Sequence, residues 1–312
     1  MNPTDYLSKA DIQRFTRRSD WQGGWLVLRN WLLIAAIFAF VATWTNPLTI
    51  LLAWILLGGQ QLGLAVLMHE AGHQTLFKTP ALNAFVGQWF CALPVLGDRA
   101  AYASSHREHH RLAGSHEDPD LPNYQNYPVS AASFRRKIWR DVSGQTGMRL
   151  LAGLFSGIGN RAMMREGEGA GVLHKGLFCN AILFALLWLA GIPEFYLLWV
   201  GAYLTSYLFV ARIRQLAEHG NVEALYEKDT RGNTRTTYAN HFERLVFAPN
   251  SVNYHVEHHL LASVPAWQLK GLHERLLEVG FYKDHPGAIA HSYWDVIKQT
   301  VPELDRAVAA QT

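Results

Sequence analysis

"LTILLAWILLGGQQLGLAVLM", Leu48 to Met68, contains no Lys, Arg, Asp or Glu. At 1.5 Å per residue a helix of this stretch is roughly 30 Å long, which is the thickness of one hydrocarbon core. The stretch therefore predicts a transmembrane helix. "HEAGH", His69 to His73, follows directly, and its two histidines are four residues apart. Both imidazoles are expected on one face of the helix, at the end of the span.

The composition of the whole chain agrees with a membrane protein. Of the 312 residues only 17% are charged while 12% are aromatic, and the formal net charge is +3. This balance favours a protein with membrane-embedded and polar parts. The basic pair Arg17–Arg18 is typical of a membrane-surface anchor rather than a nucleic-acid patch. We expect the membrane as a partner and no nucleic-acid partner.

Three more apolar stretches complete two pairs. The first pair is joined at Thr45–Pro47 and the second at Pro193–Glu194, so each predicts a hairpin with a short turn. The four transmembrane helices are expected at residues 25–44, 48–68, 176–192 and 195–211. The predicted fold class is an all-α integral membrane protein, one domain over residues 1–312, with a cytosolic helical cap that carries the histidines.

Positive charge predicts the orientation of this fold. No Lys or Arg occurs from Asn30 to Phe77 or from Gly176 to Ala211, so both short turns lack them. The positive-inside rule then places the N-terminus and the stretches 69–175 and 212–312 in the cytoplasm or at its membrane interface. We expect an active site on the cytoplasmic side of a bacterial inner membrane, or of the endoplasmic reticulum in a eukaryote.

One apolar segment, residues 79–97, is nearly long enough to cross the membrane. Pro80 and Pro94 lie near its ends, and histidine clusters precede and follow it. If the segment crossed, these clusters would face opposite compartments. We therefore expect the segment to dip into the bilayer and return, or to lie in the interface.

Histidine clusters recur along the chain. "HREHH", His106 to His110, and "HVEHH", His255 to His259, both have the i, i+3, i+4 spacing that gathers imidazoles on one side of a helix. His219 in "AEHG" follows the fourth span, so all the clusters are expected at the same depth. So many neutral imidazoles together predict metal binding. The remaining histidines are interpreted as structural: His116, His174, His241, His273, His285 and His291.

The identity of the metal has two candidate answers. "HEAGH" has the H-E-x-x-H form in which two histidines hold zinc and the glutamate activates water, so a membrane-embedded zinc protease is one alternative. One tetrahedral zinc, however, leaves the other clusters unused. Two metals sharing the histidines fit better. Imidazole suits iron, and a pair of irons can activate dioxygen.

These motifs resemble a known family. "HEAGH", "HREHH" and "NYHVEHH", with the additional "AEHG", are similar to the three histidine boxes and the extra histidine of the membrane-bound fatty acid desaturase and hydroxylase superfamily. The resemblance runs from about Leu48 to about Val264. It implies a four-helix transmembrane base with a cytosolic cap, two iron ions and O2 as co-substrate. The ligands that it implies are His69, His73, His106, His109, His110, His219, His255, His258 and His259.

The resemblance also implies the reaction. We expect an O2-dependent di-iron oxidoreductase that acts on a membrane lipid, as a desaturase that introduces a C=C bond into a fatty acyl chain. Hydroxylation or ketolation of a lipid or carotenoid is the nearest alternative, because it shares the hydrogen-abstraction step. The zinc protease is the more distant one. Four glutamates next to box histidines are candidates either for orienting imidazole N–H groups or for facing solvent: Glu70, Glu108, Glu218 and Glu257.

The source of electrons is expected to be a separate protein. "DHPGA", Asp284 to Ala288, is similar to the haem-binding motif of a fused cytochrome b5 domain, but too few residues follow it to form such a domain. We therefore expect a separate electron donor such as a ferredoxin or a free cytochrome b5. The helical periodicity from Trp267 onward predicts a cap helix that packs under the metal site.

Overall fold

The computed structural model describes residues 1–155 and 169–304. The parts of the predicted cytosolic stretches that fall on 156–168 and 305–312 lie outside the described residues. The described chain is mostly helical, as expected, with one small departure from an all-α fold. Two two-residue strands, β1 (Thr236–Thr237) and β2 (Ile289–Ala290), pair in parallel.

Fifteen α-helices lie within the described residues. They are α1 (Lys9–Phe15), α2 (Asp20–Thr43), α3 (Pro47–Gly72), α4 (Pro80–Val86), α5 (Arg99–Leu112), α6 (Ala131–Val142), α7 (Gln145–Phe155), α8 (Gly169–Leu189), α9 (Tyr196–Leu204), α10 (Ser206–His219), α11 (Thr230–Asn233), α12 (His241–Val246), α13 (His255–Leu260), α14 (Ala266–Glu278) and α15 (Tyr293–Thr300).

Four helical stretches are long and apolar enough to cross a membrane, which confirms the predicted number of spans. They are Asp20–Thr43, Pro47–Gly72, Val172–Leu189 and Pro193–His219. The fourth stretch extends beyond its prediction, because helix α10 continues through "RIRQLAEH" after the apolar run ends. Polar side chains marked the end of the apolar run but not the end of the helix.

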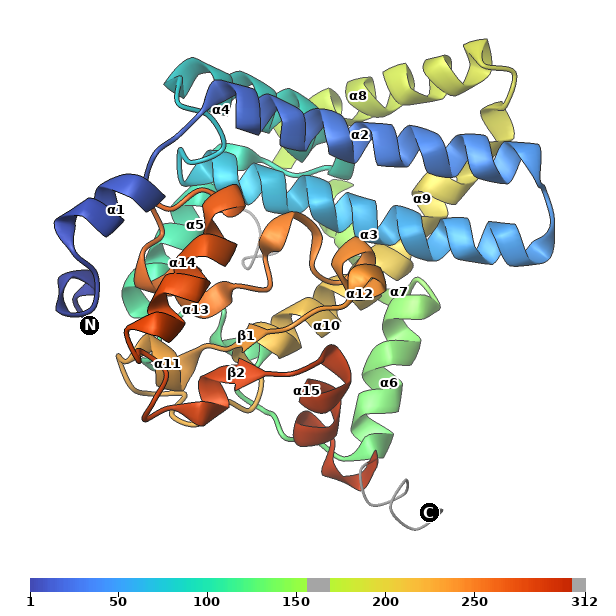
Figure 1. The fold of residues 1–312 in the computed structure, drawn as a ribbon. Helices are drawn as coiled ribbons and strands as arrows, with labels where there is room; N and C mark the ends of the chain where they lie inside the picture. Colours follow the sequence, from blue (N-terminus) through green and yellow to red (C-terminus); the bar gives the residue numbers. More distant parts are fainter. Residues whose placement is uncertain (156–168, 305–312) are drawn as a thin grey trace.

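Helices α2 and α3 lie side by side and meet through a short connection at one end (Figure 1). The Asn46 side chain caps α3 by accepting hydrogen bonds from the backbone N–H groups of Leu48 and Thr49. Pro47 occupies the first helical position, where its fixed φ suits a helix start. This Asn-Pro pair ends one apolar run and begins the next within three residues, which is why the two helices can be close neighbours.

Helix α3 is at the centre of the packing and contacts α2, α9, α10 and α12. Its glycines allow close approach: a Cβ on Gly58 would lie 2.5 Å from the Ser206 hydroxyl oxygen. Gln61 donates a hydrogen bond to the Trp199 carbonyl oxygen at 2.9 Å, and Gln60 donates to the Leu245 carbonyl oxygen at 3.1 Å. The glutamines of this span therefore serve helix packing.

The segment 79–97 is not among the four candidate spans. It contains α4, a π-helical stretch at Gly87–Ala92 and a 3₁₀ turn at Leu93–Val95. It leads to α5, which packs against the histidine-bearing end of α3, where a Cβ on Gly72 would lie 3.1 Å from the Ala103 Cβ. The histidines before and after the segment therefore lie together.

The third histidine box lies in the short helix α13, which the preceding and following segments fix. Asn253 donates a hydrogen bond to the Thr237 carbonyl oxygen of β1, and Thr237 donates its backbone N–H to the Asn253 carbonyl oxygen. Helix α14, the predicted cap helix, packs on α13 through buried side chains such as Leu272. Helices α5, α13 and α14 gather at the end of α3 opposite its short connection to α2 (Figure 1).

Candidate metal centre

All nine histidines of the predicted ligand set come together, in two adjacent groups. In each group the nearest side-chain nitrogens all lie within 4.8 Å of one another. The first group, called here the five-histidine group, consists of His69, His73, His106, His110 and His258. The second, the four-histidine group, consists of His109, His219, His255 and His259. The other six histidines belong to neither group among the described residues.

In the five-histidine group the Nε2 atoms face one another. The Nε2 of His69 lies 2.8 Å from that of His106 and 3.0 Å from that of His258. The Nε2 of His110 lies 3.0 Å from the same two atoms. The Nε2 of His73 is buried and has no hydrogen-bond partner within the described residues. Five ring nitrogens therefore lie around one shared position. Four of them make short mutual contacts, and the fifth, the His73 Nε2, has no hydrogen-bond partner within the described residues.

The four-histidine group has the same character. The Nε2 atoms of His219 and His255 lie 2.9 Å apart, and those of His109 and His259 lie 3.3 Å apart. The two groups touch through the stacked rings of His110 and His259, whose centroids are 4.3 Å apart. The nine histidines thus form one centre. In each of its two adjacent groups the ring nitrogens face a shared space, called here a cage, that could hold one metal ion.

The donor set fits metal ions better than it fits a hydrogen-bond network. Burial lowers the pKa of His73 from 6.5 to about 4, and it lowers the pKa values of His106, His255 and His258 well below 6.5, so these rings are neutral. A nitrogen of a neutral ring carries either one N–H or one lone pair, so hydrogen bonds alone do not account for both short contacts that each of four Nε2 atoms makes in the five-histidine group. Two nitrogens at right angles around an ion, each about 2.0–2.1 Å from it, would lie about 2.9 Å apart, which agrees with the observed contacts.

Asp118 orients His109. Its carboxylate accepts a hydrogen bond from the His109 Nδ1 at 2.8 Å, from the Tyr124 hydroxyl and from the Asp120 backbone N–H at 2.9 Å. Burial alone would lower the pKa of His109, but the Asp118 hydrogen bond and the nearby Asp120 charge outweigh it and raise that pKa. Burial alone would raise the pKa of Asp118, but its hydrogen bond with His109 lowers it. The hydrogen bond to Asp118 therefore keeps a proton on the His109 Nδ1 and leaves Nε2 as the nitrogen that faces the four-histidine group.

Two further imidazoles of the four-histidine group have oriented Nδ1 atoms. The His219 Nδ1 donates to the Asn233 carbonyl oxygen at 3.1 Å, and the His219 ring stacks on Tyr124 with centroids 4.8 Å apart. The His255 Nδ1 lies 3.5 Å from a Glu218 oxygen. Both contacts leave Nε2 free for a ligand in the cage.

The four glutamates next to box histidines differ in role. Glu218 and Glu70 contact box imidazoles, because a Glu70 oxygen lies 3.3 Å from the His69 Nδ1. Glu108 is exposed and pairs with Arg111, so of its two predicted roles the solvent-facing one is confirmed and the orienting one is not.

Glu257 is buried, but its carboxylate contacts residues outside the boxes. It accepts hydrogen bonds from the His273 Nδ1, the Tyr282 hydroxyl and the Thr236 hydroxyl. The prediction that Glu257 orients a box imidazole is therefore wrong. Its hydrogen bonds instead fix α13 to α14 and β1, and His273 is a satisfied structural residue, as predicted.

Three contacts of the site were missed by the sequence interpretation: Asp118, Tyr124 and the Asn233 carbonyl. Asp118 follows His109 by nine residues, in the acidic stretch "HEDPD", and that stretch was the available signal. No signal in the sequence connects Asn233 with His219, because the contact depends on the path of the loop after α10.

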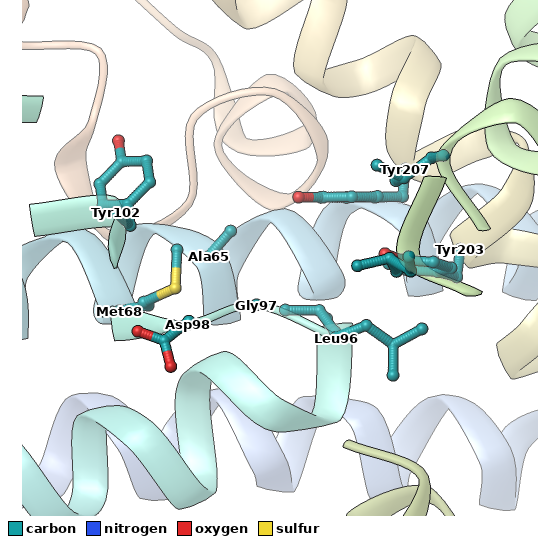
Figure 2. A pocket seen from close by; sticks show the side chains of 11 residues that line it. Ala65, Met68, Leu96, Gly97, Asp98, Tyr102, Tyr203 and Tyr207 are labelled. Atoms are coloured by element: carbon teal, nitrogen blue, oxygen red, sulfur yellow. The ribbon is translucent and has the colours of Figure 1, made fainter. Parts of the chain in front are cut away.

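A cavity of about 980 Å³ lies against both histidine groups. Its wall contains five of the nine histidines together with Tyr102, Tyr207 and several charged side chains. A smaller space of about 30 Å³ shares Ala65, Met68, Tyr102 and Tyr207 with it. Figure 2 shows this smaller space, with Tyr102 and Met68 on one side and Tyr203 and Tyr207 on the other. Its volume has room for about two water molecules.

Comparison with known proteins gives the family. The profile of the family described as "Fatty acid desaturase" matches residues 42–293, which include all nine histidines. The chain belongs to the fatty acid desaturase family. This desaturase is a membrane oxidoreductase of the lipid-desaturase type. Family membership removes the zinc-protease alternative for "HEAGH".

Relatives of this desaturase have diverse substrates. It is 30% identical over 263 residues to the dihydrorhizobitoxine desaturase of Bradyrhizobium elkanii, with 78% of this chain and 71% of that protein covered. It is 24% identical over 287 residues to the sn-1 acyl-lipid omega-3 desaturase (ferredoxin) of a Synechocystis species, with 84% and 78% covered. It is 22% identical over 234 residues to the sn-1 oleoyl-lipid 12-desaturase of a Picosynechococcus species, with 70% and 66% covered.

Proposed function

We propose that this desaturase holds two iron ions, one in each histidine group, and uses O2 to introduce a C=C bond into a fatty acyl chain of a membrane lipid. The observation that supports this proposal most directly is the pair of adjacent cages. The ligands would be His69, His73, His106, His110 and His258 for one ion and His109, His219, His255 and His259 for the other.

The reaction needs an oxidant and a reductant. Removal of two hydrogen atoms from a –CH2–CH2– unit gives –CH=CH–, and O2 with two further electrons and two protons gives two water molecules. Irons bound in these cages would supply the oxidising power that no side-chain acid or base has. The two electrons would come from a separate donor such as a ferredoxin or a cytochrome b5. The relative from Synechocystis carries ferredoxin in its name.

The protein's own residues prepare the cages. Asp118 and the Asn233 carbonyl keep the Nδ1 protons of His109 and His219 in place, so that both rings present Nε2. Tyr102 stacks on His106 with centroids 5.2 Å apart and lines the cavity beside it. An aromatic wall at this position limits the water next to the reacting carbons.

The topology proposed for the membrane follows from charge and packing. The four spans form two hairpins whose short turns face the outside, while the histidine-bearing segments form a cap on the cytoplasmic side. Close packing supports one domain, because a Cβ on Gly59 of α3 would lie 2.5 Å from the Leu245 carbonyl oxygen in the cap segment. The membrane would be a bacterial inner membrane or the endoplasmic reticulum.

Expression in a host with a simple lipid composition tests this function. We expect new unsaturated acyl chains with the wild-type protein, about two irons per chain after purification, and loss of both in His219→Ala. His116→Ala is the matched control, because His116 stacks on Tyr226 outside both groups. Hydroxylated lipids or oxidised carotenoids in place of new double bonds would refute desaturation. One zinc per chain would refute the di-iron centre.

A further inference from the structure

One cation in the wall of the large cavity has no counterion among the residues that the structure describes. Arg149 of α7 lines the cavity and is exposed, and it makes no ion pair or hydrogen bond with the part of the chain that the structure describes. The other two arginines in the wall are neutralised: Arg212 pairs with Asp141, and Arg214 pairs with Glu218 at 2.6 Å. Arg149 is therefore the arginine of this wall that is available to a ligand.

Helix α7, which carries Arg149, is fixed against the fourth candidate span. A Cβ on Gly147, two residues before Arg149, would lie 2.3 Å from the Leu204 carbonyl oxygen of that span. The position of Arg149 in the cavity wall is therefore set by close helix packing.

The histidine end of the cavity wall carries the carboxylate of Asp120. The Asp120 carboxylate belongs to the cavity wall and lies within 4.8 Å of ring nitrogens of His106 and His109. Within the described residues its carboxylate forms one ionic contact, with the His109 Nδ1 at 3.8 Å, and accepts no hydrogen bond. This carboxylate would lie beside the ions proposed for the histidine groups, and it forms no ion pair with Arg149.

Apolar surface begins next to the cation. Leu150, which follows Arg149 in α7, lines both the cavity and the small space of Figure 2, and Met68 and Tyr102 also line both. A ligand anchored at Arg149 can therefore place its uncharged carbons along these side chains without crossing the polar part of the wall.

We propose that Arg149 binds the anionic group of the substrate, a carboxylate or a phosphate ester, and so points the carbon chain toward the histidine groups. A guanidinium binds either anion through two parallel N–H···O bonds, which fixes direction as well as position. This inference rests on the proposed function. It adds that the substrate enters with a negatively charged end and that this end stays away from the irons.

Paired probes with and without charge test the inference on the iron-loaded protein in neutral detergent. Stearate is compared with methyl stearate, and 1-stearoylglycerol 3-phosphate with 1-stearoylglycerol. Binding constants and turnover are measured for wild type, Arg149→Gln and Arg149→Lys. Arg140→Gln is the matched control, because Arg140 is also an exposed arginine but lies on α6 outside this cavity.

We expect Arg149→Gln to weaken binding of one anionic probe by about 10- to 100-fold and to leave its neutral partner unchanged, since a hydrogen bond to a charged group is lost. Arg149→Lys should recover part of the affinity, and Arg140→Gln should match wild type. The anionic probe whose binding depends on Arg149 shows whether the site takes a free carboxylate or a lipid phosphate.

Two results separate this inference from the proposed function. Charge-dependent binding that requires Arg149, without desaturation of any probe, would support the anion site and count against the proposed function. Desaturation with the same preference between charged and neutral probes in wild type and Arg149→Gln would overturn the anion site and leave the proposed function standing. Failure of wild type to distinguish charged from neutral probes in binding would also overturn the anion site.

Discussion

Replacement of Asp118 by Asn tests how the four-histidine group is oriented. The change keeps the shape of the side chain but removes its charge, and it can present an N–H group to the His109 Nδ1 in place of an acceptor. The wild-type carboxylate accepts the 2.8 Å hydrogen bond from that nitrogen and is 4% exposed, so water cannot replace it. A hydrogen bond to a charged group contributes about 1.5–3 kcal/mol. Its loss corresponds to a fall of roughly 10- to 100-fold in metal affinity or activity, the usual range for such an outer contact.

The assay measures iron per chain and the rate of double-bond formation in purified Asp118→Asn, wild type and Glu108→Gln. Glu108 is the matched control, because it precedes His109 directly in the same box but pairs with Arg111 in solvent. We expect both quantities to fall in Asp118→Asn and to stay at wild-type values in Glu108→Gln. Full iron loading and activity in Asp118→Asn would refute the assignment of Asp118 as a positioning residue. Loss in Glu108→Gln alone would reverse the roles assigned to the two carboxylates.

Three further predictions concern contacts and protons. Tyr124→Phe removes one hydrogen bond to Asp118 but keeps the stacked ring, so activity should fall by less than about tenfold, and a larger loss would show that the hydroxyl does more than hold Asp118. Gly59→Ala should lower the midpoint temperature of thermal unfolding relative to Gly24→Ala. A Cβ on residue 59 would lie 2.5 Å from the Leu245 carbonyl oxygen, whereas a Cβ on residue 24 would have no neighbour within 4 Å. Equal midpoint temperatures would contradict this prediction. In the folded, metal-free protein the pKa of His73 is about 4, below its usual 6.5. The unfolded chain therefore binds the proton at a higher pH than the folded protein does. The free energy of unfolding should fall as the pH is lowered from 6.5 toward 4. The loss from this residue is about 3 kcal/mol, and unfolding midpoints that stay constant over this range would exclude it.

The spans could be predicted from the sequence because a long apolar run has few structural alternatives. The end of α10 could not, since the helix continues to His219 through polar residues that no apolar pattern marks. The two-residue strands were also missed, because a pairing between Thr236–Thr237 and Ile289–Ala290 depends on tertiary packing rather than on local preference. Polar helix ends and very short strands are set by the surroundings.

The histidines of the site could be predicted because i, i+3 and i+4 spacing is a local property of a helix. Their outer contacts were only partly predictable. Glu108 and Glu257 both neighbour box histidines in sequence, yet one faces solvent and the other bonds to α14 and β1. Asp118 orients His109 from nine residues away. Sequence adjacency places a side chain near a box but does not say which face of the helix it occupies.

The histidines of each of the two boxes in α5 and α13 are divided between the two groups. In α5 the i, i+4 pair His106 and His110 belongs to the five-histidine group, while His109 belongs to the other group. In α13 the roles are exchanged, with His255 and His259 in the four-histidine group and His258 in the five-histidine group.

Four residues advance about 40° past a full helical turn and three residues stop about 60° short of one, so a single helix presents imidazoles to two neighbouring points. Each of the two helices therefore contributes to both cages, and the separation of the cages is set by helix geometry rather than by loops. Helices α3 and α10 supply histidines to one group each, so the division within α5 and α13 is what connects the two groups. A substitution that distorts α5 or α13 should weaken both cages together, whereas loss of His219 from α10 should act first on the four-histidine group.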